Sequence, residues 1–183
     1  MRLSACLIVR NEEKFLDSGL SSLSGVIDEL VIVDTGSTDR SRQIALDHGA
    51  ILIDEPWRND FAWSRNLGLQ KATGDWILYI DADEVLEASL SDLSALDDPS
   101  VIAATVRFRP ASNLTCYREY RLFRNRPDIR FKGVIHETVR PAIDEVMAAE
   151  GGRVVHTKAH IEHLGYEGDL THKHHRNRPI LLK

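Results

Sequence analysis

The sequence predicts an α/β protein with a mostly parallel central sheet, helices on both faces and a smaller mixed or antiparallel extension. Over the first hundred residues, short β-branched runs alternate with helical patterns, which is typical of parallel βαβ units. Several of these runs end in polar residues. After residue 100, two more runs follow without an intervening helical pattern. Because 183 residues suffice for one domain and are short for two, we expect a single domain over residues 1–183.

The first four strands are predicted from apolar runs at Leu3–Val9, Glu29–Val33, Ala50–Ile53 and Trp76–Ile80. Connections between parallel strands are right-handed, so these strands are expected to form an open sheet with helices on both faces. The later runs at Val101–Phe108 and Tyr117–Phe123 are expected to extend the sheet in a mixed or antiparallel arrangement.

Three helices are predicted between the parallel strands. Asn11 is expected to cap the first helix, which Gly25 ends. The second runs to about His48, and the third covers Phe61–Ala72. Residues 169–183 are also helical in pattern and carry no stop signal, so a continuation of the acceptor-side region beyond residue 183 in a longer parent protein stays open.

The composition is that of a folded protein whose charge is unevenly distributed. Hydrophobic residues make up 43% of the chain and the net charge is −5, which excludes a disordered or collagen-like chain. The first hundred residues hold 8 basic and 19 acidic side chains, and the remainder holds 15 and 9. Apolar runs stay well short of the roughly 20 residues that span a bilayer, and Cys6 and Cys116 have no metal-type spacing. We therefore expect a cytoplasmic protein, with the inner face of the membrane as an alternative location.

An acidic tetrapeptide, Asp81-Ala82-Asp83-Glu84, follows the fourth predicted strand. Ligands of open α/β sheets bind at the carboxyl ends of the strands, where these carboxylates are expected. Two carboxylates one residue apart can bind one hard cation such as Mg²⁺ or Mn²⁺, whose other ligands are water and phosphate oxygens. The alternative is an acidic loop that caps the next helix.

A polar run from Asp34 to Asp39 follows the second predicted strand in the same way. Small residues in this run, Gly36 and Ser37 among them, let backbone amides approach a ligand, and an Asp can accept hydrogen bonds from a base or ribose. A turn followed by a helix cap is the structural alternative. The run lacks the spacing of the phosphate loop and of the dinucleotide fingerprint, which disfavours those two modes of nucleotide binding.

Six of the eight histidines lie between His156 and His175. His160 and His163 could face one metal ion, whereas the others are expected at the surface or in loops. A separate zinc site is disfavoured because no cysteine joins the histidines. The basic residues and histidines after residue 171 are expected to form a helix face that contacts phosphate or, peripherally, a membrane surface.

Seven motifs, taken in order along the chain, resemble one family. They are Val9–Glu12, Asp34–Asp39, Phe61–Asn66, Gly74–Glu84, Tyr120–Arg124, Phe131–Glu137 and His163–Tyr166. Together they are similar to the family 2 glycosyltransferases, and they cover nearly the whole chain. The resemblance implies the GT-A fold, the nucleotide-diphospho-sugar transferase fold. It also implies a nucleotide-sugar-binding half over residues 1–100 and an acceptor-side half over residues 101–183.

The resemblance implies a pocket for the nucleotide sugar. Asp34 and Asp39 are similar to the residues that contact the nucleoside. Arg65 is similar to a basic residue near the base or diphosphate, and Asn66 would support it. The other residues that the resemblance assigns to this pocket are Arg10, Asn11, Glu12, Gly36, Ser37 and Asp81.

The resemblance also implies a site for Mg²⁺ or Mn²⁺ and a general base. Asp83 would ligate the metal on the diphosphate, Asp81 would hold the ribose or a metal-bound water, and His163 would supply a late ligand. Glu137 occupies the place of the base in inverting members, which often have an acidic pair where this chain has His136 before Glu137. The alternative for Glu137 is a turn residue paired with a nearby arginine.

The chemistry agrees with these roles. Negative charge grows on the β-phosphate as the anomeric bond breaks, and a divalent cation stabilises that charge. A carboxylate on the opposite face can take the proton of the attacking hydroxyl. We therefore expect a metal-dependent inverting glycosyltransferase that moves a sugar from a nucleoside diphosphate donor, such as a UDP-sugar, to a saccharide or lipid-linked acceptor of the cell envelope or a polysaccharide.

Two other functions are weighed against this one. The alternative is a nucleotide-sugar-binding module without transferase activity. A nucleotidylyltransferase is disfavoured because Val9–Glu12 lacks the required Gly-rich loop. No nucleic-acid partner is expected. Trp57 and Trp63 could stack on a base or sugar or pack in the core. The basic residues expected to face the diphosphate or an anionic acceptor are Arg118, Arg121, Arg124, Arg126 and Lys132.

Overall fold

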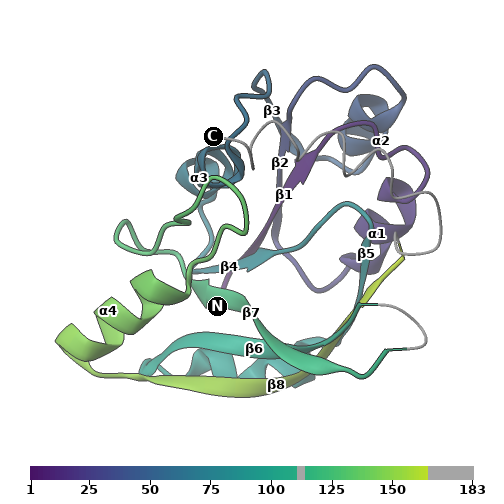
Figure 1. Ribbon diagram of the computed structural model, residues 1–183. Helices are drawn as coiled ribbons and strands as arrows, with labels where there is room; N and C mark the ends of the chain where they lie inside the picture. Colours follow the sequence, from purple (N-terminus) through teal and green to yellow (C-terminus); the bar gives the residue numbers. More distant parts are fainter. Residues whose placement is uncertain (111–113, 165–183) are drawn as a thin grey trace.

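The computed structural model describes residues 1–110 and 114–164. They form a mixed sheet of eight strands in the order β3-β2-β1-β4-β7-β6-β8-β5, with helices on both faces (Figure 1). The predicted α/β class is therefore confirmed. The strands are β1 (Leu3–Val9), β2 (Glu29–Asp34), β3 (Ile51–Asp54), β4 (Trp76–Tyr79), β5 (Glu84–Glu87), β6 (Val101–Arg109), β7 (Tyr117–Arg124) and β8 (Arg153–His163).

The parallel part of the sheet is formed by the four strands that the apolar runs predict. β1 pairs in parallel with β2 on one side and with β4 on the other, and β3 pairs in parallel with β2. Their carboxyl ends therefore meet at one edge of the sheet. β1, β2 and β4 are buried over almost their whole length because helices cover both faces, so these strands read as continuous apolar runs.

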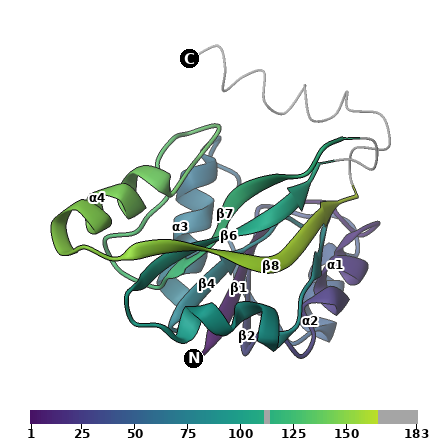
Figure 2. The same cartoon turned by 90° about the horizontal axis from the view of Figure 1, so that it is seen from below.

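The extension is mixed, as predicted, and larger than the sequence indicated. β7 is antiparallel to both β4 and β6, and β8 is parallel to β6 and antiparallel to β5. The strands of the extension run across the direction of β1 and β2, as a strongly twisted sheet requires (Figures 1 and 2). The sequence did not predict β5 or β8. Both border residues of the predicted metal site, because β5 begins at Glu84, next to Asp83, and β8 ends at His163.

The helices cover the two faces of the sheet with two separate cores. Helices α1 (Leu16–Ser22) and α2 (Ser41–Asp47) and the 3₁₀ helix η1 (Leu90–Asp97) contribute to one core, which contains Trp76. Helices α3 (Phe61–Lys71) and α4 (Arg140–Glu150) contribute to the other. The sequence did not predict η1 or α4.

The prediction that Asn11 caps the first helix is wrong. α1 begins at Leu16, and its N-cap residue is Phe15. Asn11 has φ 55° and lies in the loop between β1 and α1. Asn tolerates this left-handed conformation better than most residues, so the same residue type that suits a helix cap is used here in a loop.

No helix within residues 1–110 and 114–164 is long and apolar enough to cross a membrane. The helix predicted over residues 169–183, with its basic face and its proposed contact with phosphate or a membrane, lies outside the described residues.

Candidate active site

A cavity of about 270 Å³ opens at the edge where the parallel strands end. Half of its lining residues are ones to which the resemblance assigned a binding, metal or catalytic role: Arg10, Glu12, Arg65, Asp81, Asp83, Glu137 and His163. The remaining lining residues are Ile8, Thr35, Trp57, Phe61, Ala82, Ile135 and His136. The cavity therefore collects side chains from the ends of β1, β2 and β4, from α3, and from the loop that carries Glu137.

Three of the predicted nucleotide-binding residues tie loops together and do not line the cavity. The Asn11 amide nitrogen donates to Ser37 Oγ at 3.0 Å, and Asn11 Oδ1 accepts from the Thr38 amide at 2.7 Å. Asp39 Oδ2 accepts from the Glu13 amide at 3.1 Å. Asn11, Ser37 and Asp39 thus join the loop after β1 to the loop after β2.

Asp34 lies buried at the end of β2, with one carboxylate oxygen in use and the other without a partner. Oδ1 accepts from the amides of Gly36 and Ser37 and from Arg42 Nη1, at 3.2, 3.0 and 2.9 Å. Gly36 has φ 104°, a conformation that favours glycine. Oδ2 is buried and has no hydrogen-bond partner among the described residues. A buried acceptor in this state is costly unless a ligand supplies an N–H or O–H group.

Arg65 is the central cation of the site. On α3, it donates from Nε to Glu137 Oε1 at 2.6 Å and from Nη2 to Asp81 Oδ1 at 2.8 Å. Its guanidinium also lies over the rings of Tyr79 and Phe131, 5.2 and 5.3 Å from their centroids. Nη1 is buried without a hydrogen-bond partner among the described residues, so one donor of this cation is available to a ligand.

Neighbouring opposite charges keep both Arg65 and Asp81 ionised. Burial opposes the charge on Arg65, but Asp81 and Glu137 outweigh it and raise the pKa of the guanidinium above its ordinary value. Burial likewise opposes the ionisation of Asp81, but Arg65 and Arg121 hold the pKa of that carboxyl below its ordinary value. Asp81 is therefore an anion and Arg65 a cation at neutral pH.

Asn66 does not line the cavity. Its side-chain amide donates to the Phe131 carbonyl at 3.0 Å and accepts from the Phe131 amide at 2.9 Å. This double contact anchors the segment that leads to Glu137, six residues further along the chain. The structure gives Asn66 a supporting place in the site.

The acidic turn after β4 directs its carboxylates in two directions. Asp83 Oδ2 lies 3.2 Å from His163 Nε2, and both side chains are 10% exposed. Glu84 pairs with His163 where β5 and β8 lie side by side, and this pairing brings His163 next to Asp83. Glu84, in contrast, points away from the cavity and forms a buried ion pair with Arg121. Burial raises the pKa of Glu84 to about 7 even with Arg121 against it.

The residues around Asp83 fit part of a divalent metal site. Among the described residues, no group of three or more His, Cys, Asp or Glu side chains is arranged to hold a metal ion. Asp83 and His163 supply one carboxylate and one imidazole at hydrogen-bonding distance. A Mg²⁺ or Mn²⁺ ion bound there would take its remaining ligands from water and phosphate oxygens, which is the usual arrangement for cations that accompany a diphosphate.

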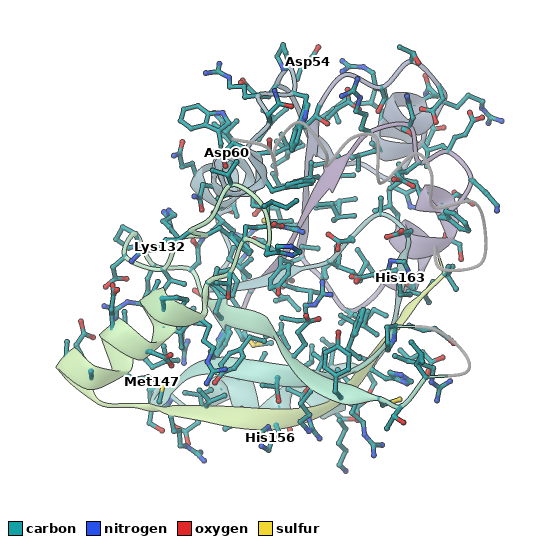
Figure 3. All side chains as sticks on the ribbon, in the orientation of Figure 1. Asp54, Asp60, Lys132, Met147, His156 and His163 are labelled. Atoms are coloured by element: carbon teal, nitrogen blue, oxygen red, sulfur yellow. The ribbon has the colours of Figure 1, made fainter. Side chains whose placement is uncertain are left out.

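His160 does not share a site with His163. Three residues apart on a strand, the two side chains point to opposite faces. His160 Nδ1 lies 3.4 Å from Glu87 Oε2 and Nε2 lies 4.0 Å from Cys116 Sγ. His156 lies near the start of β8, well away from His163 (Figure 3), and its Nδ1 is 2.7 Å from Thr105 Oγ1. The prediction that His160 and His163 face one metal is therefore wrong.

Glu137 sits on a loop that an isolated bridge between Lys132 and Thr138 closes. Two residues of this loop have left-handed backbone, Gly133 at φ 104° and His136 at φ 57°. The Glu137 side chain is 12% exposed and lies on the cavity wall, paired with Arg65. The two interpretations of Glu137, an arginine partner and a group facing the substrate, are thus both compatible with its position.

An aromatic pair from the loop after β3 and the start of α3 forms another part of the wall. The rings of Trp57 and Phe61 meet edge to face with centroids 4.7 Å apart, and Trp57 Nε1 donates to Asn59 Oδ1 at 3.1 Å. For Trp63 the sequence allowed the same two interpretations as for Trp57, stacking on a ligand or packing in the core. Trp63 is 45% exposed, stacks with Arg58 and does not line the cavity. Phe61 was missed because its apolar character is equally typical of a helix core.

The five basic residues that were expected to face the diphosphate or an anionic acceptor do not line the cavity, which corrects that expectation. Arg121 pairs with Glu84, and Arg126 pairs with Asp128 and Glu150. Arg118 and Arg124 donate to backbone carbonyls, and Lys132 pairs with Glu145. Three of these five cations are therefore paired with carboxylates within the fold.

Known proteins share this fold. Glucosyl-3-phosphoglycerate synthase from Mycobacterium tuberculosis, crystallised with phosphoglyceric acid, is similar over 98% of this chain and 77% of its own, with a TM-score of 0.67 and 16% identity. TarS from S. aureus is similar over 100% of this chain and 39% of its own, with a TM-score of 0.65 and 17% identity. These likenesses confirm the GT-A fold that the motif order implied.

Sequence comparison identifies the family. A TPR repeat-containing protein of Synechococcus elongatus is 46% identical over 142 residues, which are 75% of this chain and 35% of that protein. Glycosyltransferase SunS, of SPbeta prophage origin in Bacillus subtilis, is 30% identical over 147 residues, 72% of this chain and 33% of its own. The chain spans about a third of the length of the curated relatives it matches. The model of glycosyl transferase family 2 matches residues 4–144, and the chain belongs to that family.

Proposed function

We propose that this chain is the catalytic domain of a metal-dependent inverting glycosyltransferase that uses a UDP-sugar donor. The observation that carries the proposal is that two buried polar atoms, Asp34 Oδ2 and Arg65 Nη1, have no hydrogen-bond partner among the described residues. Arg65 lines the cavity together with Asp83 and His163. Asp34 lies at the end of β2, next to the lining residue Thr35. Asp34 Oδ2 is an acceptor and Arg65 Nη1 a charged donor. A nucleotide sugar offers the complementary groups, an N–H of the base and oxygens of the diphosphate or sugar.

The names of similar structures support this choice of ligand. Glucosyl-3-phosphoglycerate synthase from M. tuberculosis was crystallised with Mn²⁺ and UDP, and a TarS fragment of S. aureus was crystallised with UDP. These facts belong to those proteins. They favour UDP and Mn²⁺ as the first probes for this chain.

Each residue of the site has a task in the proposed reaction. Asp34 accepts a hydrogen bond from the base, and Arg65 holds an oxygen of the donor through Nη1. Asp83 and His163 would hold the cation, which neutralises charge on the departing diphosphate when bound. Glu137 takes the proton from the acceptor hydroxyl, because its carboxylate lies on the cavity wall and Arg65 fixes its orientation.

The acceptor is proposed to be a saccharide or lipid-linked molecule of the cell envelope or a polysaccharide. Ile135 and His136 line the cavity next to Glu137, and Val134 in the same loop is exposed. This loop is therefore the surface that an acceptor would meet first. Loops of this kind differ most between related proteins, so they set acceptor choice.

A calorimetric titration of UDP with and without Mn²⁺ tests the donor and metal parts of the proposal. We expect Mn²⁺ to tighten UDP binding by about tenfold or more, and Asp83→Asn to abolish most of that gain, as loss of a charged ligand does. Asp17→Asn is the matched control, because Asp17 is an exposed partner of His48 on the helix layer. Equal UDP affinity in all conditions would refute the metal role.

Enzyme activity needs a second assay, because a binding module without transferase activity would pass the first. Release of UDP from a panel of UDP-sugars, with water or oligosaccharides as acceptor, distinguishes the two. Metal-dependent UDP release supports the transferase. Tight UDP binding with no release from any donor would favour the binding module.

A further inference from the structure

A buried ion pair lies directly beneath the acidic turn after β4. Arg121 on β7 donates from Nη1 to Glu84 Oε2 at 3.0 Å and from Nη2 to Glu84 Oε1 at 2.8 Å. The two side chains are 5% and 1% exposed. Neither lines the cavity. Burying a charge pair costs desolvation energy, and replacing such a pair with apolar residues is often neutral or stabilising. Stability alone is therefore a weak reason for this arrangement.

The pair is built into the turn through the backbone. Glu84 Oε2 also accepts from the Asp81 amide at 2.8 Å, so the carboxylate closes the turn on itself. Arg121 is held in turn by the rings of Tyr79 and Phe108, whose centroids lie 4.7 and 5.0 Å from its guanidinium carbon. The position of the Asp81 backbone is thus linked to a cation that cannot move without disturbing two aromatic side chains.

Helix α1 supports the same turn from a third direction. Gly19 packs so closely that a Cβ atom there would lie 2.8 Å from the Glu84 carbonyl oxygen and 3.3 Å from that of Ala82. The Leu164 amide donates to the Asp83 carbonyl at 2.7 Å from the opposite side. The turn is therefore fixed by α1, β7 and the end of β8 together.

We propose that Glu84 and Arg121 are positioning residues that fix the Asp81 to Asp83 turn, so that Asp83 meets the cation on the donor diphosphate without reorganisation. The inference rests on the proposed function and assigns Glu84 a task different from that of the two aspartates beside it. Residues that orient a metal ligand typically contribute 10- to 100-fold to metal affinity. Fixing the turn before binding avoids an ordering cost at the moment of binding.

The test compares Glu84→Gln with Glu119→Gln. Both glutamates contact Arg121, since Glu119 Oε2 accepts from Arg121 Nε at 2.8 Å, but only Glu84 also reaches the Asp81 amide. The two variants therefore remove one negative charge beside the same arginine. Only Glu84→Gln alters the support of the turn.

Two affinities are measured for each folded variant by calorimetry: that of uridine, and that of UDP with and without Mn²⁺. Uridine reports the nucleoside end of the cavity, which a general loss of structure would disturb. The gain in UDP affinity on adding Mn²⁺ reports the turn. For Glu84→Gln we expect this gain to fall by about tenfold while uridine affinity stays within about twofold. Glu119→Gln should leave both unchanged.

A second variant, with a matched control, disturbs the turn without changing any charge and covers the case in which Glu84→Gln does not fold. Gly19→Ala pushes on the turn. Gly68→Ala in α3 is its control, because a Cβ there would make ordinary contacts at 3.5 and 3.8 Å. We expect Gly19→Ala to reduce the Mn²⁺ gain and Gly68→Ala to keep it.

The outcomes separate this inference from the function on which it rests. If the unmodified protein binds UDP with no gain from Mn²⁺, the proposed metal-dependent function fails first. If the unmodified protein shows the gain and folded Glu84→Gln or Gly19→Ala keeps it in full, the positioning role is wrong. A reduced gain with intact uridine binding supports it.

Discussion

Arg65 and Glu137 lie 72 positions apart in the sequence, and their side chains meet at 2.6 Å between Nε and Oε1. Arg65 comes from α3 and Glu137 from the loop before α4. The same guanidinium holds Asp81 at 2.8 Å, so one cation connects the proposed base to the acidic turn. Arg65 and Glu137 are nearly buried and Asp81 is partly exposed. A network of this kind restricts the orientation of its members, which suits the proposed binding of a donor and an acceptor at one site.

Removal of Arg65 is expected to destabilise the fold and to impair donor binding. Arg65→Gln leaves two carboxylates without their cation, at a cost of about 3 kcal/mol in the free energy of unfolding. Arg65→Lys keeps the charge but loses the forked geometry, so it should recover only part of the stability. Urea unfolding measures the free energy of unfolding of both variants.

Arg126→Gln is the control for Arg65, because the ion pairs of Arg126 lie at the surface. Its loss should cost less than about 1 kcal/mol. Equal costs for Arg65→Gln and Arg126→Gln would contradict the structural importance given to Arg65.

Glu137→Gln should separate binding from turnover. The amide oxygen of Gln can still accept from Arg65, so UDP affinity is expected to stay within about twofold. It cannot take a proton, and loss of a general base typically lowers kcat by about 100-fold or more. Glu145→Gln, at an exposed partner of Lys132, is the control for loss of a glutamate charge. Near-normal turnover in Glu137→Gln would remove Glu137 from the mechanism.

Trp57 and Trp63 should differ in their effect on nucleotide binding. Trp57 lines the cavity beside Phe61, whereas Trp63 stacks with Arg58 outside it. Stacking of an aromatic side chain on a base contributes about 1–3 kcal/mol. We expect Trp57→Ala to weaken UDP binding by about tenfold and Trp63→Ala to leave it unchanged. The same affinity in both variants would exclude base stacking on Trp57.

The two cysteines should react very differently with a thiol reagent. Cys6 is buried in β1, and burial raises the pKa of its thiol to about 12. Because the thiolate is the reactive form, Cys6 should stay inert near pH 8, whereas half-buried Cys116 should react. Titration with DTNB should count one thiol in the native protein and two after unfolding. Native Cys116→Ser should count none, and a rapidly reacting thiol in that variant would contradict the burial of Cys6.

Three strands of the parallel part, β1, β2 and β4, were predictable because each is buried on both faces and therefore has a run of consecutive apolar residues. β1, β2 and β4 follow this pattern within a residue at their ends. β5 has four residues, two of them glutamates, so its sequence carries no such pattern. The long β8 alternates polar and apolar residues and contains two histidines and a lysine among its last six positions. A strand that lies partly at the surface is harder to recognise from one sequence.

The site was predictable to the extent that it follows strand ends. Asp81 and Asp83 line the cavity because the edge of a parallel sheet is where such residues come together. Asp39 and Asn66 were assigned to the nucleotide pocket, yet they hold loops in place by hydrogen bonds to the backbone. Asp and Asn serve both purposes with the same chemical groups, so the residue type does not distinguish them.

The sequence by itself determined the fold class, the order of the parallel strands along the chain and the family, because periodicity and motif order are local properties. The tertiary structure decided which charges meet. Glu84 joins Arg121 across 37 positions and Arg65 joins Glu137 across 72, and no spacing rule connects either pair. Ion pairs depend on which strands become neighbours and on how deeply their side chains are buried. Both are settled only when the whole sheet is assembled.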